Sequence, residues 1–168
     1  MALLVAFSIV GGTALGDELP HRKPGLWEIV TTDAASKRAP MIQRMCLDRE
    51  TDALLNKMGM SAGQQACAKN DVHVSGNRVT VHAVCDMGST QLTSDGVITY
   101  SGDSSYRNEM HGKFQPPMAG LAETHTVQEG KWTGACPADM KPGDVVMSQG
   151  PGGREMKMNL RSMLGAPH

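Results

Sequence analysis

The chain has 168 residues, of which 40% are apolar and 20% are charged, and its formal net charge is −1 at pH 7. A chain of this length typically forms one domain. The balance of 16 Lys and Arg against 17 Asp and Glu excludes the basic surplus that is typical of nucleic-acid-binding proteins. Two features need an explanation: the four Cys, and the 13 Met in a chain with only two each of Trp, Tyr and Phe.

The first residues of the chain are typical of a secretory signal peptide. An apolar run over residues 3–10 is followed by Gly11-Gly12, by further small residues and then by Asp17-Glu18. The run is shorter than the roughly 20 residues that a membrane-spanning helix needs. We therefore expect a signal peptide over residues 1–16, no membrane span in the mature chain, and a periplasmic or secreted location. Disulfides persist in such compartments.

Near the start of the mature chain, residues 26–32 and 41–46 are rich in strand-forming residues. Asp48 follows the second strand and is suited to cap a helix, because its carboxylate can accept hydrogen bonds from the amides of the first turn. The apolar spacing then predicts a short helix that ends at Gly59, since glycine commonly terminates helices.

From Cys67 onward the pattern alternates between strands and turns. Strands are predicted over residues 72–85 as a hairpin with a turn at Gly76-Asn77, and over residues 90–94, 97–100, 105–111, 123–127 and 131–135. The pattern indicates an all-β domain over residues 17–137, an antiparallel meander curled into a barrel or half-barrel with one short helix and two disulfides. Residues 138–168 form a Gly-, Pro- and Met-rich tail with a short terminal helix, either docked or disordered.

Four Cys allow three disulfide pairings. Cys67 and Cys85 flank the Gly76-Asn77 turn almost symmetrically, and a register in which paired positions sum to 152 places them opposite each other. The apolar residues prefer a sum of 153, which pairs Val72 with Val81. A bulge near Lys69-Asn70 reconciles the two registers.

We therefore predict a Cys67–Cys85 disulfide, and Cys46–Cys136 by elimination. A redox or metal role for these residues is disfavoured, because the sequence contains no C-x-x-C motif.

Five short segments, taken together, resemble a known family. They are Arg22-Lys23-Pro24-Gly25-Leu26-Trp27-Glu28, Met45-Cys46-Leu47, Ser75-Gly76-Asn77, Tyr100-Ser101-Gly102-Asp103-Ser104-Ser105-Tyr106 and Lys131-Trp132-Thr133-Gly134-Ala135-Cys136-Pro137. Their order is similar to that of the exported bacterial family catalogued as domain of unknown function 3617. The resemblance covers roughly residues 22–137. It implies export and a shared fold, and it supplies no catalytic residues.

Two motifs are candidates for catalysis or metal binding. Gly59-Met60-Ser61-Ala62-Gly63 matches the G-x-S-x-G motif of hydrolases, but a helix rather than a strand precedes it, which disfavours a nucleophile elbow. In the 153 register Asp71 lies opposite His82, with His73 diagonally on the same face, and such a set can bind a divalent metal. A solvated polar strand is the competing interpretation.

The remaining candidates concern the methionines and the tryptophans. Met156-x-Met158 and Met110-His111 are the nearest approaches to a Cu(I) site, although methionine also fills cores that are poor in aromatic residues. Trp27 and Trp132 are predicted to line a ligand pocket at the mouth of the curled sheet, or to pack in its core.

These observations favour a non-enzymatic exported module, without a cofactor, that binds a small apolar ligand or an envelope protein. The alternative function is periplasmic handling of copper or zinc.

Overall fold

The computed structural model describes residues 19–34 and 38–163, so the predicted signal peptide over residues 1–16 lies outside the described residues. The elements in the described ranges are β1 (Gly25–Asp33), β2 (Met41–Leu47), α1 (Arg49–Ala66), β3 (Cys67–Ser75), β4 (Arg78–Asp86), β5 (Gln91–Ser101), β6 (Ser105–Met118), β7 (Leu121–Gly134), β8 (Asp144–Gln149), β9 (Met156–Asn159) and α2 (Leu160–Met163). None of the helices in these ranges is long and apolar enough to cross a membrane.

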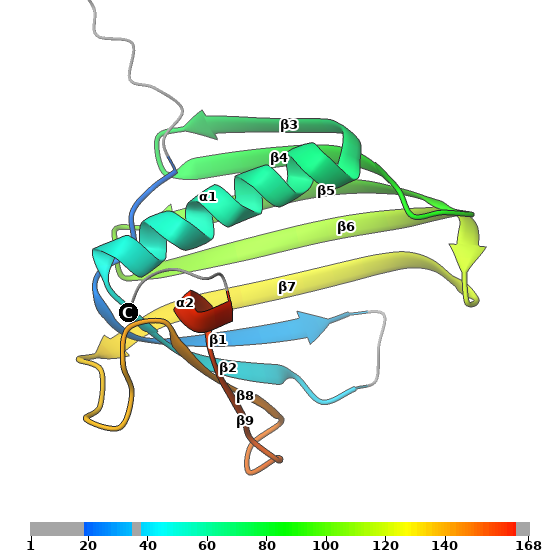
Figure 1. The fold of residues 1–168 in the computed structure, drawn as a ribbon. Helices are drawn as coiled ribbons and strands as arrows, with labels where there is room; N and C mark the ends of the chain where they lie inside the picture. The colour runs from blue at the N-terminus through cyan, green and yellow to red at the C-terminus, as the bar shows by residue number, and fades with distance from the viewer. Residues whose placement is uncertain (1–18, 35–37, 164–168) are drawn as a thin grey trace, which may run out of the picture.

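The strands form one antiparallel sheet in the order β3-β4-β5-β6-β7-β1-β2-β8-β9 (Figure 1). Strands β3 to β7 follow one another in chain order, as the predicted meander requires. The β1–β2 hairpin is inserted between β7 and β8, so the sheet is not a simple meander. The two edge strands, β3 and β9, do not pair with each other, and the sheet is therefore not closed into a barrel. The predicted antiparallel all-β class is confirmed.

Both predicted disulfides are present, Cys67–Cys85 and Cys46–Cys136. The β3–β4 register changes directly after the first cysteine of this hairpin, because Cys67 faces Cys85 whereas Val72 faces Val81. Ala68 has no partner across the hairpin and forms the bulge. The bulge lies one to two residues before its predicted position, and it allows the disulfide and the apolar face to coexist.

Two glycines that the sequence analysis places between strands lie inside strands. A Cβ at Gly96 in β5 would come within 1.9 Å of the Met110 sulfur, and a Cβ at Gly130 in β7 within 2.2 Å of the Tyr106 ring. Each glycine therefore makes room for a large side chain from the neighbouring strand β6. The prediction of separate short strands on either side of each glycine is wrong, because β5 and β7 are continuous.

Helix α1 begins as predicted, with the Asp48 carboxylate accepting a hydrogen bond from the Thr51 amide at 2.8 Å. It does not end at Gly59, as predicted, but continues through Gly63 to Ala66. The helix can continue because packing against the sheet outweighs the modest helix-breaking tendency of glycine, roughly 1 kcal/mol per residue. A Cβ at Gly63 would lie 2.4 Å from the Asn70 side chain, so this glycine permits close packing of α1 on β3.

The G-x-S-x-G motif lies entirely within α1. The Ser61 hydroxyl donates a hydrogen bond to the Lys57 carbonyl oxygen at 2.7 Å, one helical turn earlier. The strand-to-helix turn that exposes a hydrolase nucleophile is therefore absent at Ser61.

The segment treated as a tail contributes to the sheet. Strand β8 pairs with β2 and β9 pairs with β8, and Val145 and Val146 of β8 are buried. The short helix α2 follows, and its Arg161 donates hydrogen bonds to the Asp48 carboxylate at 2.8 and 2.9 Å. This charged contact attaches α2 to the first turn of α1, while β8 attaches the preceding residues to the sheet.

Candidate functional site

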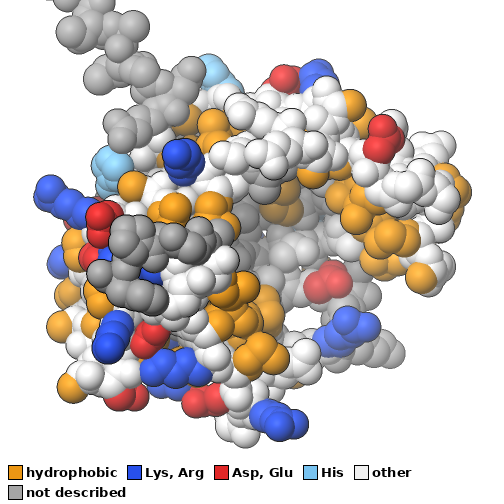
Figure 2. Space-filling model, in the orientation of Figure 1, with side chains coloured by type: hydrophobic (Ala, Val, Ile, Leu, Met, Phe, Trp, Pro, Cys, Tyr) orange, Lys and Arg blue, Asp and Glu red, His pale blue; other side chains and the backbone are white. Residues whose placement is uncertain are grey.

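A cleft of about 430 Å³ lies between α1 and the face of the sheet that the helix crosses. We call this the helix face. Figure 2 shows that the molecule is hollowed beside the helix, with hydrophobic side chains gathered around the hollow. The lining includes Met45, Val79, Ile98 and Met110 from the strands and Leu55 and Met60 from α1. The cleft is therefore largely apolar.

Strand alternation determines which residues reach the cleft. Tyr106, Asn108 and Met110 of β6 line it, so Arg107 and Glu109 lie on the opposite face of the sheet. We call the opposite face the outer face. The two faces differ in chemistry, because the helix face is rich in apolar side chains and the outer face carries most of the charged groups of β3 to β7.

A few polar groups are placed within the apolar lining. The Tyr106 hydroxyl donates a hydrogen bond to Gln128 at 3.1 Å, and the Gln128 amide donates to Thr31 at 3.4 Å. Burial raises the pKa of Tyr106 to about 12, so its hydroxyl is neutral at physiological pH. The Asn108 Oδ1 atom is buried and has no hydrogen-bond partner among the described residues. Because the atom is shielded from solvent, a ligand could satisfy this acceptor only if the Asn108 side chain turned toward the cleft.

A charged pair lies at one end of the cleft. The Arg22 guanidinium, which lines the cleft, donates from Nε to Asp52 at 2.6 Å, and the Arg22 backbone amide donates to the same carboxylate at 3.1 Å. The Asp52 side chain is 1% exposed. Because each charge is neutralised by the other, this end of the cleft offers no strong net field for an ionic ligand.

The two tryptophans lie opposite each other in the β1–β7 register. Trp27 is completely buried in the main core, and neither indole belongs to the lining of the cleft. Both indole N–H groups donate to backbone carbonyls of the chain entering β1, Trp27 to Lys23 at 2.8 Å and Trp132 to Pro24 at 3.0 Å. A ligand pocket at these residues stays a prediction, and their observed contacts are structural.

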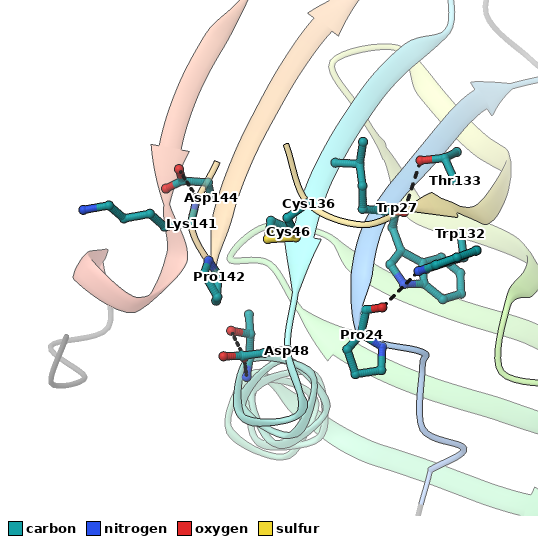
Figure 3. Close-up of a disulfide and its surroundings, with 12 residues drawn as sticks. Pro24, Trp27, Cys46, Asp48, Trp132, Thr133, Cys136, Lys141, Pro142 and Asp144 are labelled. Atoms are coloured by element: carbon teal, nitrogen blue, oxygen red, sulfur yellow. Dashed lines mark hydrogen bonds between the residues drawn. A yellow bond between two sulfur atoms is a disulfide. The ribbon is translucent and has the colours of Figure 1, made fainter. Parts of the chain in front are cut away.

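Figure 3 shows how close the segments that carry the family resemblance lie to one another. Pro24 just before β1, Trp27 in β1 and Trp132 near the end of β7 all lie on the same side of the Cys46–Cys136 disulfide, toward β1 and β7. The first and the last of the segments that resemble the family thus lie close together. Their contacts join β7, β1 and β2, which are three of the strands that line the cleft.

The structure places the predicted metal-binding residues on the outer face, with Asp71 opposite His82 as expected from the 153 register. His82 bonds instead to Asp95, with Nδ1 2.8 Å from Oδ1. Asp71 is engaged by Lys69 at 3.1 Å. Within the described residues, Asp71, His73 and His82 do not bring three donor atoms together, although all three line one open hollow of about 600 Å³.

Sequence reasoning did not identify the residues that line the cleft. The alternation of Tyr106, Asn108 and Met110 within a predicted strand was a usable signal, since it places all three on one face. The partners of that face come from α1 and β1, and their positions depend on strand pairings that local patterns do not specify.

The fold and the cleft define the class of the protein. It is a single open antiparallel β-sheet that is cross-linked by two disulfides, with a helix that crosses one face and an apolar cleft between the helix and the sheet. The family model described as "Protein of unknown function (DUF3617)" matches residues 22–136. The chain belongs to this family. No curated protein and no solved structure matches the chain.

Proposed function

We propose that the protein is a non-catalytic binding module that holds a small, largely apolar molecule in the cleft between α1 and the sheet. The observation that carries this proposal is the largely apolar cleft, whose lining includes Asn108, a residue with a shielded side-chain oxygen that has no partner among the described residues. Leaving such an acceptor without a partner costs roughly 1–3 kcal/mol. A ligand that brings one hydrogen-bond donor among apolar atoms would recover this free energy.

The size and chemistry of the cleft support a small ligand. Its volume of about 430 Å³ falls within the range of roughly 300–1,000 Å³ that is common for small-molecule sites. Such sites are mostly apolar and carry a small number of polar groups that orient the ligand. The neutral Tyr106 hydroxyl and the paired charges of Arg22 and Asp52 fit an uncharged ligand better than an ionic one.

The proposal includes a location outside the cytoplasm. Two disulfides are typical of proteins in oxidising compartments such as the periplasm or the extracellular space. There the module would bind a molecule of the cell envelope or its surroundings. An envelope protein is the competing partner, and it would need an extended contact surface rather than a cleft of small-molecule size.

The test uses N-phenyl-1-naphthylamine, an apolar probe with one N–H donor whose fluorescence rises in apolar surroundings. We expect saturable binding to the wild-type protein. Gly59 of α1 lines the cleft, and a Cβ built there meets nothing within 4 Å. A Gly59→Leu side chain should occupy that space and weaken binding at least about tenfold, or 1.4 kcal/mol.

Gly59→Ala is the matched control. It removes the same glycine and should raise helix stability by up to about 1 kcal/mol, while it fills far less of the cleft and leaves binding nearly unchanged. Asn108→Leu provides a second test, because it removes the acceptor and should weaken binding of the donor probe without destabilising the fold. Absence of saturable binding, or equal affinity in Gly59→Leu and Gly59→Ala, would refute the proposal.

A further inference from the structure

The outer face carries a row of acidic and histidine side chains that crosses five strands. The register pairs Asp71 with His82, His82 with Asp95, Asp95 with His111, and His111 with His125, from β3 to β7. Directly paired side chains on one face of a sheet lie about 4.5–5.5 Å apart at Cβ. The row is therefore continuous, and it lies on the opposite side of the sheet from the cleft.

At the β6–β7 end of the row, three potential metal donors converge. His125 Nε2 lies 2.8 Å from Glu109 Oε1, and His111 Nε2 lies 3.7 Å from the same oxygen. The donor atoms of these three residues are all within 4.8 Å of one another. The two imidazole rings are stacked, with their centroids 4.0 Å apart and their planes at 18°. Both rings thus present the same nitrogen to one carboxylate.

We propose that Glu109, His111 and His125 form a binding site for a divalent transition-metal ion of the zinc type. Tetrahedral coordination with bonds of 2.0–2.2 Å separates neighbouring donors by roughly 3.3–3.5 Å. The two nitrogen-to-oxygen distances, 2.8 and 3.7 Å, lie on either side of this value, and the stacked rings must turn out of their parallel arrangement so that both Nε2 atoms point at one ion. The ion takes the place of the Nε2 proton of His125, which is released to the solvent, and a water completes the coordination.

The surrounding charges favour a cation. The Glu109 carboxylate supplies the negative charge of the site, and its Oε1 atom faces both imidazoles. Arg107 contacts the other oxygen, Glu109 Oε2, at 3.4 Å, and also Glu129 at 2.7 Å. It therefore orients the carboxylate without covering Oε1. Asp95, opposite His111, adds a further negative charge.

The donor types restrict the metal. Two imidazoles and one carboxylate suit Zn²⁺, Cu²⁺ and Ni²⁺, whereas Mg²⁺ and Ca²⁺ prefer oxygen ligands and Cu(I) prefers sulfur. The site also differs from the one that the sequence indicates, at Asp71, His73 and His82. It does not depend on the cleft, because its residues alternate along β6 with those that line the cleft.

Isothermal titration calorimetry of the tag-free, EDTA-treated protein with ZnCl₂ tests the site. We expect one Zn²⁺ per chain and no binding of MgCl₂. His125→Ala and Glu109→Gln should each weaken Zn²⁺ binding at least about tenfold. His73→Ala is the matched control, since this exposed histidine lies on the same face but outside the cluster, and it should leave the affinity unchanged. Far-UV circular dichroism verifies that each variant is folded.

The ¹⁵N resonances of the imidazoles give a second measurement. Zn²⁺ should shift those of His111 and His125 and leave that of His73 in place. The absence of any heat of Zn²⁺ binding to the wild type would overturn the proposal. Zn²⁺ affinity in His125→Ala equal to that of the wild type would also overturn it. Loss of binding in His73→Ala with retention in His125→Ala would also overturn it, and would assign the metal to the β3–β4 hairpin.

Discussion

The ring of Tyr106 lies directly over Gly130, its partner in the β6–β7 register. A Cβ at Gly130 would come within 2.2 Å of the ring, so only glycine leaves room for it. The same ring lies 5.9 Å from Trp27 and 5.9 Å from Tyr100, measured between centroids. One missing side chain in β7 thus allows an aromatic row to connect the main core with the cleft.

Gly130→Ala should destabilise the protein by roughly 1–3 kcal/mol, because the new methyl group displaces Tyr106 and the packing around it. Urea denaturation of the wild type and the variant measures the difference. The Gly59→Ala variant serves as the control, since it also adds one methyl group but into open space, and it should not lower stability. Equal stability of the Gly130→Ala variant and the wild type would show that the ring can move without cost.

Where two local signals coincided, the sequence was enough to predict the structure. The Gly76-Asn77 turn and the spacing of Cys67 and Cys85 determine one register, and the valines determine another. Their conflict required a bulge, which the structure has directly after Cys67. The start of α1 at Asp48 was predictable for a similar reason, because a cap acts on residues only three positions away.

Other features depend on partners that are distant in sequence. Gly96 and Gly130 look like turn residues until the large side chains of β6 are placed over them. The pairing of β1 with β7 spans about a hundred residues and no local pattern specifies it. The cleft follows from these pairings, so it was not predictable. His125 meets Glu109 only through a β6–β7 register that shifts near its turn, so symmetry about that turn does not reveal the pair.

The two disulfides should contribute unequally to stability. Cys46–Cys136 closes a separation of 90 residues and Cys67–Cys85 one of 18. Loop-closure entropy predicts contributions of roughly 4.5 and 3 kcal/mol respectively. Guanidinium denaturation of the Cys46→Ala/Cys136→Ala and Cys67→Ala/Cys85→Ala variants compares them without reductant. A larger loss in the second variant would mean that strain or packing, rather than loop entropy, governs the difference.

Asp48 should make the protein sensitive to acid. Burial opposes its ionisation, but hydrogen bonds from Thr51 and the charge of Arg161 outweigh burial and hold the pKa of Asp48 below its usual value. Because the folded pKa is lowered, this stabilisation is complete above the ordinary pKa of about 4 and is lost as the pH falls through the folded value.

Asp48→Asn keeps a helix cap but removes the charge that Arg161 binds. We expect the variant to be less stable than the wild type at pH 7, with a difference that shrinks toward pH 3 in urea denaturation. Glu50→Gln is the control, because Glu50 also contacts Arg161, at 2.9 Å, but is 83% exposed and should matter little. A difference that does not change with pH would contradict the role of the Asp48 charge.

The buried pair of Arg22 and Asp52 should show strong coupling. Arg22→Met leaves the Asp52 carboxylate, only 1% exposed, without its main partner, and should cost roughly 3–5 kcal/mol. The double variant Arg22→Met/Asp52→Leu removes both charges and should be less destabilised than Arg22→Met alone. His21, whose Nδ1 lies 3.5 Å from the same carboxylate, is kept in both variants. A double-mutant cycle with Arg22→Met, Asp52→Leu and the double variant measures the coupling by urea denaturation. If the losses of unfolding free energy in the two single variants simply add up to that of the double variant, the two charges do not depend on each other.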